Sequence, residues 1–183
     1  MLARYPRSLV ARELSRVAIA GRLVFYRRDY GGTNDRDAIY LTCRGLDEGF
    51  DDAHLRGVLH AEFSSVLWRN HADLFDRAAF EAALPPDFSY GGSGVEVLHR
   101  RDLDASDPED LAAGFLTRYA RSSLENDLNT LVRGMMLRPE DLVALARRHP
   151  RLRAKALVVA SFYESLGVPD AAALRRRLAE TGD

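Results

Sequence analysis

The feature that most constrains this sequence is residues 55–68, a stretch of helical periodicity that carries ionisable side chains among apolar ones. Leu55, Leu59 and Phe63 recur at spacings of four, so one face of the helix is apolar and is expected to be buried. Glu62 lies inside this stretch, and a carboxylate is rarely buried without a partner. We therefore expect the fold to be organised around this helix, and Glu62 requires a specific explanation.

The surroundings of Glu62 resemble the H-E-x-x-H helix of zincin metallopeptidases, in which two His one turn apart bind zinc and the Glu is the general base. With Glu62 as the motif's glutamate, the two ligand positions hold Ala61 and Ser65. Alanine has no donor atom, and a neutral serine hydroxyl is a poor zinc ligand. His60 is one residue out of phase, about 100° around the helix from position 61. The helix therefore keeps the glutamate of the motif but not the two side chains that bind zinc.

Length and charge set broad limits on the class of protein. A chain of 183 residues with 46% hydrophobic and 29% charged residues has the composition of a globular domain and can bury a substantial core. The formal net charge is -1, so no overall field favours nucleic acid, and we expect no nucleic-acid partner. No apolar run is long enough to cross a bilayer, and no signal peptide is visible, because Arg alternates with apolar residues near the start.

A small sheet is predicted ahead of the central helix. Residues 6–18 are expected to form a helix that starts at Pro6. Strands are predicted over residues 22–28 and 37–43, and residues 30–35, rich in Gly, Asn and Asp, are expected to form a turn. The two strands either form a hairpin or lie separately in one sheet. Asp51 or Asp52 is expected to cap the central helix.

The rest of the chain is predicted to be helical, with one long irregular connection. Two prolines end a helix over residues 73–84, and the connection that follows, up to Asp107, is a candidate rim or lid because of its length. Further helices are expected to begin near residues 107, 122, 138, 151 and 169. Ser122 and Glu125 have the spacing of a capping box at the start of the second of these.

Several segments together carry a family resemblance. They are Tyr30-Gly31-Gly32-Thr33, Ile39-Tyr40-Leu41, His60-Ala61-Glu62-Phe63-Ser64-Ser65, residues 114–120, residues 122–129 and residues 162–167. In this order and spacing they resemble the zinc-binding metallopeptidases related to the substrate-import-associated zinc metallohydrolase lipoproteins of bacteria. The resemblance extends from about residue 5 to residue 167.

This resemblance implies a zincin-like α+β fold in a single domain over residues 1–183, with a small N-terminal sheet, a central motif helix and a helical C-terminal part. It also implies a bacterial, extracytoplasmic setting, a metal helix H-H-E-F-x-H, and a downstream Glu-Asp pair that completes the metal site. The pair falls on Asn126 and Asp127, whereas a shift of one residue would restore Glu125 as a ligand. Together with the alanine and serine on the helix, Asn126 replaces the third ligand of the family.

Three functions follow as hypotheses. In the first, the chain is a pseudoenzyme that binds no cofactor, with Ala61, Ser65, Asn126 and Asp127 as the vestigial site. It would be a binding or structural module for a peptide, protein or glycan held in the former active-site cleft. The second is an active metal-dependent peptidase or other hydrolase that binds zinc through variant ligands. The third is a protein that binds a polyanion through its arginine-rich helices.

The hydrolase hypothesis assigns a role to each of four residues. Glu62 would be the general base, Tyr119 would stabilise an oxyanion, and His60 and Glu125 would be the alternative zinc ligands. Each has a structural alternative. Glu62 would be a hydrogen-bonded buried carboxylate, His60 a satisfied core residue, Tyr119 an aromatic wedge and Glu125 part of a helix cap. The sequence leaves the oligomeric state open.

Overall fold

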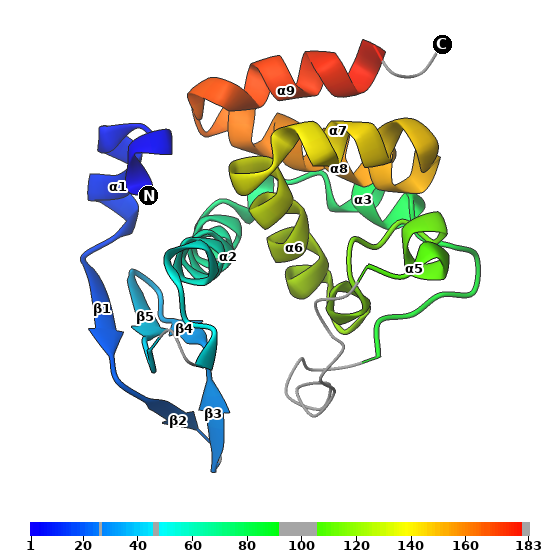
Figure 1. Cartoon of the computed structure of the whole chain (residues 1–183). Coiled ribbons are helices and arrows are strands. Elements are labelled where there is room, and N and C mark those ends of the chain that lie inside the picture. The colour runs from blue at the N-terminus through cyan, green and yellow to red at the C-terminus, as the bar shows by residue number, and fades with distance from the viewer. Residues whose placement is uncertain (26, 46–47, 92–105, 181–183) are drawn as a thin grey trace. The chain divides into compact units, whose positions relative to one another are not determined.

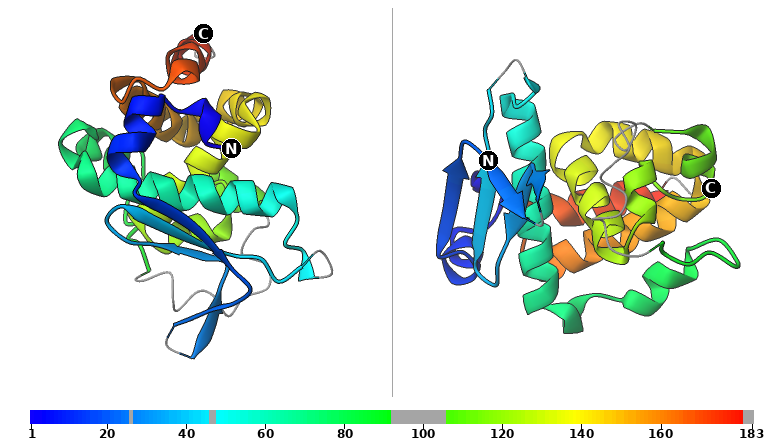
Figure 2. Two further views of the ribbon diagram at one scale, coloured as in Figure 1. Left: turned by 90° about the vertical axis from the view of Figure 1, so that its left-hand side faces the viewer. Right: turned by 90° about the horizontal axis from the view of Figure 1, so that it is seen from below.

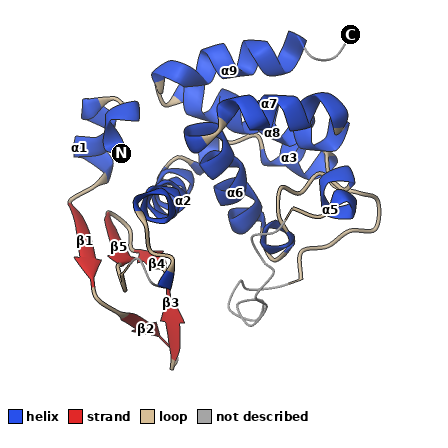
Figure 3. Cartoon of the chain, viewed as in Figure 1, coloured by secondary structure: helices blue, strands red, loops and turns tan. Residues whose placement is uncertain are grey.

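A computed structural model of the chain describes residues 1–25, 27–45, 48–91 and 106–180. Its described residues form two small β-sheets and eight α-helices, which confirms the predicted α+β class (Figures 1 and 3). The chain divides into two compact units, Met1–Ala72 and Asp73–Asp183, and each is described by itself. Both sheets belong to the first unit.

The first unit contains five short strands. They are β1 (Arg16–Ala20), β2 (Leu23–Phe25), β3 (Arg28–Tyr30), β4 (Gly32–Asn34) and β5 (Ala38–Thr42). The central strand of the three-stranded sheet is β5, which pairs in parallel with β1 and antiparallel with β4. The strands β2 and β3 form a separate antiparallel pair. The edges of the larger sheet are therefore β1 on one side and β4 on the other.

Two α-helices accompany these strands: α1 (Arg7–Glu13), which follows the 3-10 turn η1 (Leu2–Arg4), and α2 (Asp52–Asn70). The long helix α2 packs on β4 and β5 (Figure 2), and the core between them is apolar. Its fully buried side chains include Ile39, Leu41 and Phe63. The side chain of Asp51 accepts a hydrogen bond from the backbone N–H of His54, which confirms the predicted cap of this helix.

Three predictions for the first unit were wrong. The predicted helix over residues 6–18 ends at Glu13, because the β-branched side chains that follow join a parallel strand pair with β5. The predicted turn over residues 30–35 contains β4, so tertiary pairing overrides the turn preference of its Gly and Asn. The predicted strands do not form one hairpin or share one sheet, because β2 pairs with β3 whereas β5 lies in the other sheet.

The second unit is helical in its described residues. Its elements follow the 3-10 turn η3 (Ala72–Leu74) and are α3 (Arg77–Ala82), α5 (Pro108–Ala112), the 3-10 turn η4 (Arg118–Arg121), α6 (Leu124–Leu137), α7 (Pro139–Arg148), α8 (Pro150–Ser165) and α9 (Pro169–Glu180). The helix α8 packs against α3, α6, α7 and α9 and is the centre of this unit. Proline occupies the first turn of α5, α7 and α8, where its missing N–H has no intrahelical partner in any case.

Most helix starts in the second unit agree with the sequence prediction, and two differ. The helix predicted over residues 73–84 is shortened to α3, because Asp76 caps the helix through its side chain. The cap of α6 is Ser123, whose hydroxyl accepts from the backbone N–H of Asn126, so the predicted capping box between Ser122 and Glu125 was wrong. The candidate lid includes residues 92–105, which lie outside the described residues.

Membrane insertion by a helix was not expected from the sequence. Across the described residues, every helix falls short of the length and apolar character that crossing a bilayer requires. This finding agrees with the expectation.

Candidate functional site

The candidate site on α2 consists of the positions around Glu62. Ala61 and Ser65 are one helical turn apart, as the two His of a zinc motif would be. Ala61 and Glu62 are half-buried, whereas Ser65 is 1% exposed. The helix therefore presents a methyl group and a buried hydroxyl where a zincin presents two imidazoles.

The carboxylate of Glu62 is joined to the neighbouring strand. Asn34 on β4 donates from Nδ2 to Oε2 of Glu62 over 2.6 Å. The other side-chain atom of Asn34, Oδ1, accepts from Arg69 over 2.6 Å, and Arg69 also donates to the backbone carbonyl of Asp35. One asparagine thus connects β4 to two side chains that lie about two turns apart on α2. The carboxylate that the sequence marked as a possible base takes part in the packing of the helix on the sheet.

A glycine permits this close approach of strand and helix. A Cβ atom at Gly32 would lie 2.4 Å from Cγ1 of Val58 and 3.1 Å from Oε1 of Glu62. The first of these distances is too short for any side chain, and the valine is β-branched and therefore stiff. Gly32 is required here because of its missing side chain. Its position lets β4 lie directly against the α2 surface that carries Glu62.

His60 lies on the buried side of α2. A hydrogen bond of 2.8 Å joins its Nδ1 to the hydroxyl of Tyr5, and the two rings lie 5.6 Å apart. Burial in these apolar surroundings lowers the pKa of His60 to about 4, and the positive charges of the N-terminal amine and Arg4 act in the same direction. The imidazole is therefore neutral at pH 7, with one ring nitrogen engaged by Tyr5.

The remaining residues singled out by the sequence lie in the second unit. Tyr119 is in η4 and half-buried, and its backbone carbonyl accepts from the hydroxyl of Ser122. Asn126 donates from Nδ2 to the same hydroxyl over 2.8 Å. Glu125 is half-buried in the first turn of α6. These contacts hold the start of α6 against the turn that precedes it.

Asp127 is the most deeply buried of the predicted site residues. Its Oδ2 accepts from Nζ of Lys155 over 2.6 Å and from the hydroxyl of Tyr90 over 2.9 Å. Burial raises the pKa of Asp127 to about 6, although Lys155 and Tyr90 both act to lower it. Burial likewise lowers the pKa of Lys155, against the attraction of the carboxylate. This is a buried ion pair in which the low polarity of the surroundings disfavours the charged form of both groups.

Two aromatic rings complete the surroundings of this ion pair. Nζ of Lys155 lies 3.9 Å from the centroid of the Phe115 ring and 5.6 Å from that of Phe80. Ring faces attract cations, so they compensate in part for the water that the ammonium group has lost. Both charged side chains are 0% exposed. The arrangement is typical of a structural ion pair.

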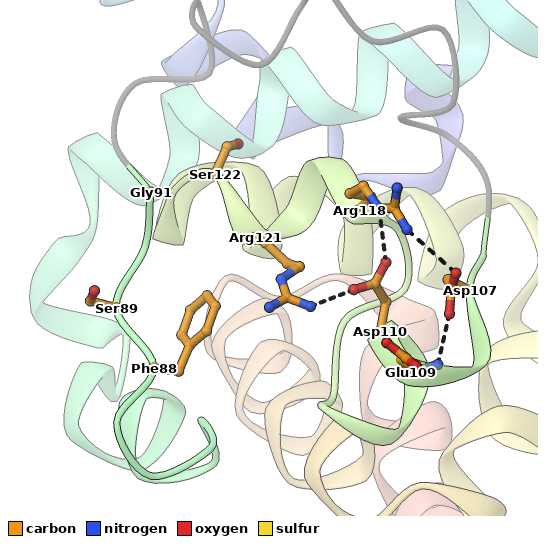
Figure 4. A pocket seen from close by; sticks show the side chains of 9 residues that line it. All are labelled: Phe88, Ser89, Gly91, Asp107, Glu109, Asp110, Arg118, Arg121 and Ser122. Atoms are coloured by element: carbon orange, nitrogen blue, oxygen red, sulfur yellow. Dashed lines mark hydrogen bonds and ion pairs between the residues drawn. The ribbon is translucent and has the colours of Figure 1, made fainter.

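A pocket of about 480 Å³ lies in the second unit (Figure 4). Its charged lining is largely neutralised within the protein. Arg121 donates to Oδ1 of the buried Asp110 over 2.6 Å, and Nε of Arg118 lies 3.6 Å from Oδ2 of the same carboxylate. The guanidinium of Arg121 also lies over the rings of Phe88 and Phe115. The sequence analysis did not identify this pocket.

The side chains at the motif positions do not fit a zinc ion. Ala61 offers no donor, Asn126 uses its amide group within its own unit, and Asp127 is bound by a lysine. Within residues 1–25, 27–45, 48–91 and 106–180, no group of three or more His, Cys, Asp or Glu side chains is arranged to hold a metal ion.

Comparisons of the chain with family models, with curated proteins and with solved structures find no match. The zincin-like family therefore rests on the sequence resemblance alone.

Sequence reasoning did not predict the contacts that Asn34, Tyr5 and Lys155 make. The sequence placed Asn34 in a turn and Tyr5 ahead of the first helix, and neither position signalled a contact with α2. Lys155 did carry a signal, since it is the single lysine among 26 basic residues and lies in an apolar helical stretch. A long, flexible side chain with a compact charge suits a closed pocket better than the broad, planar guanidinium of arginine.

Proposed function

We propose that this chain is a zincin-like domain that has lost its zinc ligands and acts as a binding module. The observation that carries the proposal is on α2. Ala61 and Ser65 flank Glu62 at the spacing of metal ligands, while Glu62 itself is bound by Asn34. A metallopeptidase needs this carboxylate to activate a metal-bound water. Here its hydrogen bond serves the contact between β4 and α2.

Other polar groups of the vestigial site support the same proposal. His60 is neutral and bonded to Tyr5, and Asn126 is bonded to Ser122. Asp127, which corresponds to the aspartate of the family's Glu-Asp pair, is hydrogen-bonded to a buried lysine. Each group has a structural partner within its own unit.

The edge strand β4 indicates the kind of ligand. Thr42 donates its N–H to the carbonyl of Gly31, and Asp35 donates to Ala38, so the odd-numbered residues of this strand bond to β5. In an antiparallel pair the alternate residues direct their N–H and C=O groups to the other side. Gly32 and Asn34 therefore present their backbone groups at the edge of the sheet. An extended peptide that adds a strand to this edge is the ligand we propose.

Zinc content and turnover separate this proposal from the hydrolase hypothesis. Protein purified without added metal is expected to hold far less than one zinc per chain by elemental analysis. It is also expected not to cleave a mixture of fluorogenic peptides, with or without a chelator. Stoichiometric zinc together with chelator-sensitive cleavage that Glu62→Gln abolishes would establish an active enzyme instead.

Peptide binding at β4 is tested by amide resonances of isotope-labelled protein. Titration with a panel of unstructured peptides is expected to shift and protect the amides of Gly32 and Asn34. Thr33 is the internal control, because the alternation places its amide toward β5. If peptides bind and leave these two amides unchanged, the ligand does not add to this edge.

A further inference from the structure

The opposite edge of the three-stranded sheet is formed by β1 and exposes apolar side chains. Val17 is 39% exposed and Ile19 is 62% exposed, although their parallel neighbours Ile39 and Leu41 on β5 are buried. No further strand of the described residues pairs with β1 on its outer side (Figure 1). Edge strands that expose both backbone groups and apolar side chains favour pairing with another strand.

The hydrogen-bond pattern identifies which backbone groups face outward. Cys43 donates its N–H to the carbonyl of Ala20, so Ala20 bonds to β5. Along a parallel strand, residues that bond to a given neighbour alternate with residues that face away from it. The N–H and C=O groups of Val17 and Ile19 therefore point away from β5. The residues with the exposed apolar side chains are also those with outward backbone groups.

We propose that a second copy of this chain pairs with β1 through its own β1, antiparallel, about a two-fold axis at Ala18. In this register Val17 faces Ile19 of the second copy, and Ile19 faces Val17 of the second copy. The outward N–H and C=O groups of these residues then form hydrogen-bonded pairs across the axis. The interface is isologous, because one strand supplies both sides of it.

Side chains and charges favour a second copy as the occupant. Residues opposite each other in a sheet share a face, so the four exposed valine and isoleucine side chains of the two copies would cover one another. Arg16 would face Ala20 of the second copy, so no like charges meet across the strands. Arg16 is also held on its own subunit, because it donates to the hydroxyl of Tyr40 over 2.6 Å and lies over that ring. The paired copies would form one six-stranded sheet.

A disulfide at the axis tests this register directly. Ala18 would face its own counterpart in a non-hydrogen-bonded pair, where Cα atoms are about 4.5 Å apart, within the range for a disulfide. The variant Ala18→Cys with Cys43→Ser is expected to form a covalent dimer under mild oxidation. The matched control is Ala20→Cys with Cys43→Ser. Position 20 would lie four residues from its counterpart in the second copy, about 13 Å away, which is too far to bridge.

The association is measured by sedimentation of the natural sequence and two variants. The chain is expected to sediment as a dimer, and Ile19→Pro as a monomer with unchanged circular dichroism. Proline at this edge position removes the outward N–H and the exposed isoleucine side chain, and it breaks no hydrogen bond to β5. Val24→Lys changes another exposed apolar residue, outside β1, and is expected to stay dimeric. The proposal is overturned if the natural chain is monomeric at every attainable concentration, or if both cysteine variants cross-link equally. Neither result bears on the zinc and peptide experiments above.

Discussion

His60 shows how burial sets the charge state of a side chain in this protein. Its pKa in the folded state is about 4, below the ordinary value of 6.5, because the charged form is disfavoured in apolar surroundings. The folded state therefore resists protonation more than the unfolded state does. The contribution of His60 to the free energy of unfolding is fully present above pH 6.5. It is lost as the pH falls toward 4, because the unfolded chain is protonated first.

We expect the free energy of unfolding of the first unit to fall over this pH range. The loss is about 3 kcal/mol for a pKa lowered to this extent, at about 1.4 kcal/mol per pKa unit. Urea unfolding at a series of pH values measures it. In His60→Gln, which keeps a polar group near Tyr5 and does not titrate, the dependence between pH 6.5 and 4 is expected to flatten. An unchanged slope in this variant would show that another group is responsible.

The ion pair between Asp127 and Lys155 gives a second expectation at this scale. Lys155→Met leaves a buried carboxylate without its cation and is expected to destabilise the second unit by about 3–5 kcal/mol. Combining it with Asp127→Leu removes both charges, and apolar groups of similar volume are expected to restore most of that loss. Urea unfolding of the two variants measures the difference. Equal instability of the single and the double variant would contradict an electrostatic origin.

At the scale of elements, the contact between β4 and α2 depends on the absence of a side chain at Gly32. Gly32→Ala would place a methyl group 2.4 Å from Val58, so strand or helix must move. Overpacking of this kind typically destabilises by about 1–3 kcal/mol. Thr33→Ala is the control, because it alters the next residue of the same strand without adding volume. Thermal unfolding checks both variants, and a Gly32→Ala protein as stable as the natural chain would refute the close contact.

The elements themselves were predictable where the sequence signals were local. A proline at the first turn fixed the start of α7, and the apolar periodicity of residues 55–68 identified α2. The strands were less predictable, because strand pairing is set by partners distant in the sequence. Val17 has a strand-forming side chain but also fits the apolar stripe of a helix. Its pairing with Ile39 decides between the two.

At the scale of the whole molecule, the candidate site is only partly visible in the sequence. The resemblance to the zinc motif is carried by spacing alone, with Ala61 and Ser65 at the positions of the two ligands. What Glu62 and Asp127 do instead was not predictable, since their partners Asn34 and Lys155 are 28 residues away along the chain in each case. Spacing along one helix can be compared with a motif, whereas contacts between distant segments require the fold.

Restoring the three ligands tests whether this chain is a zincin scaffold that has lost them. Zinc affinity is measured for two variants that share Ala61→His/Ser65→His. The first adds Asn126→Glu. The second adds Asn126→Gln, which matches the glutamate in size without its charge. If the fold places the third position beside the other two, as in a zincin, the glutamate variant should bind one zinc per chain at least about tenfold more tightly, or about 1.4 kcal/mol. Equal affinity of the two variants would contradict the zincin arrangement.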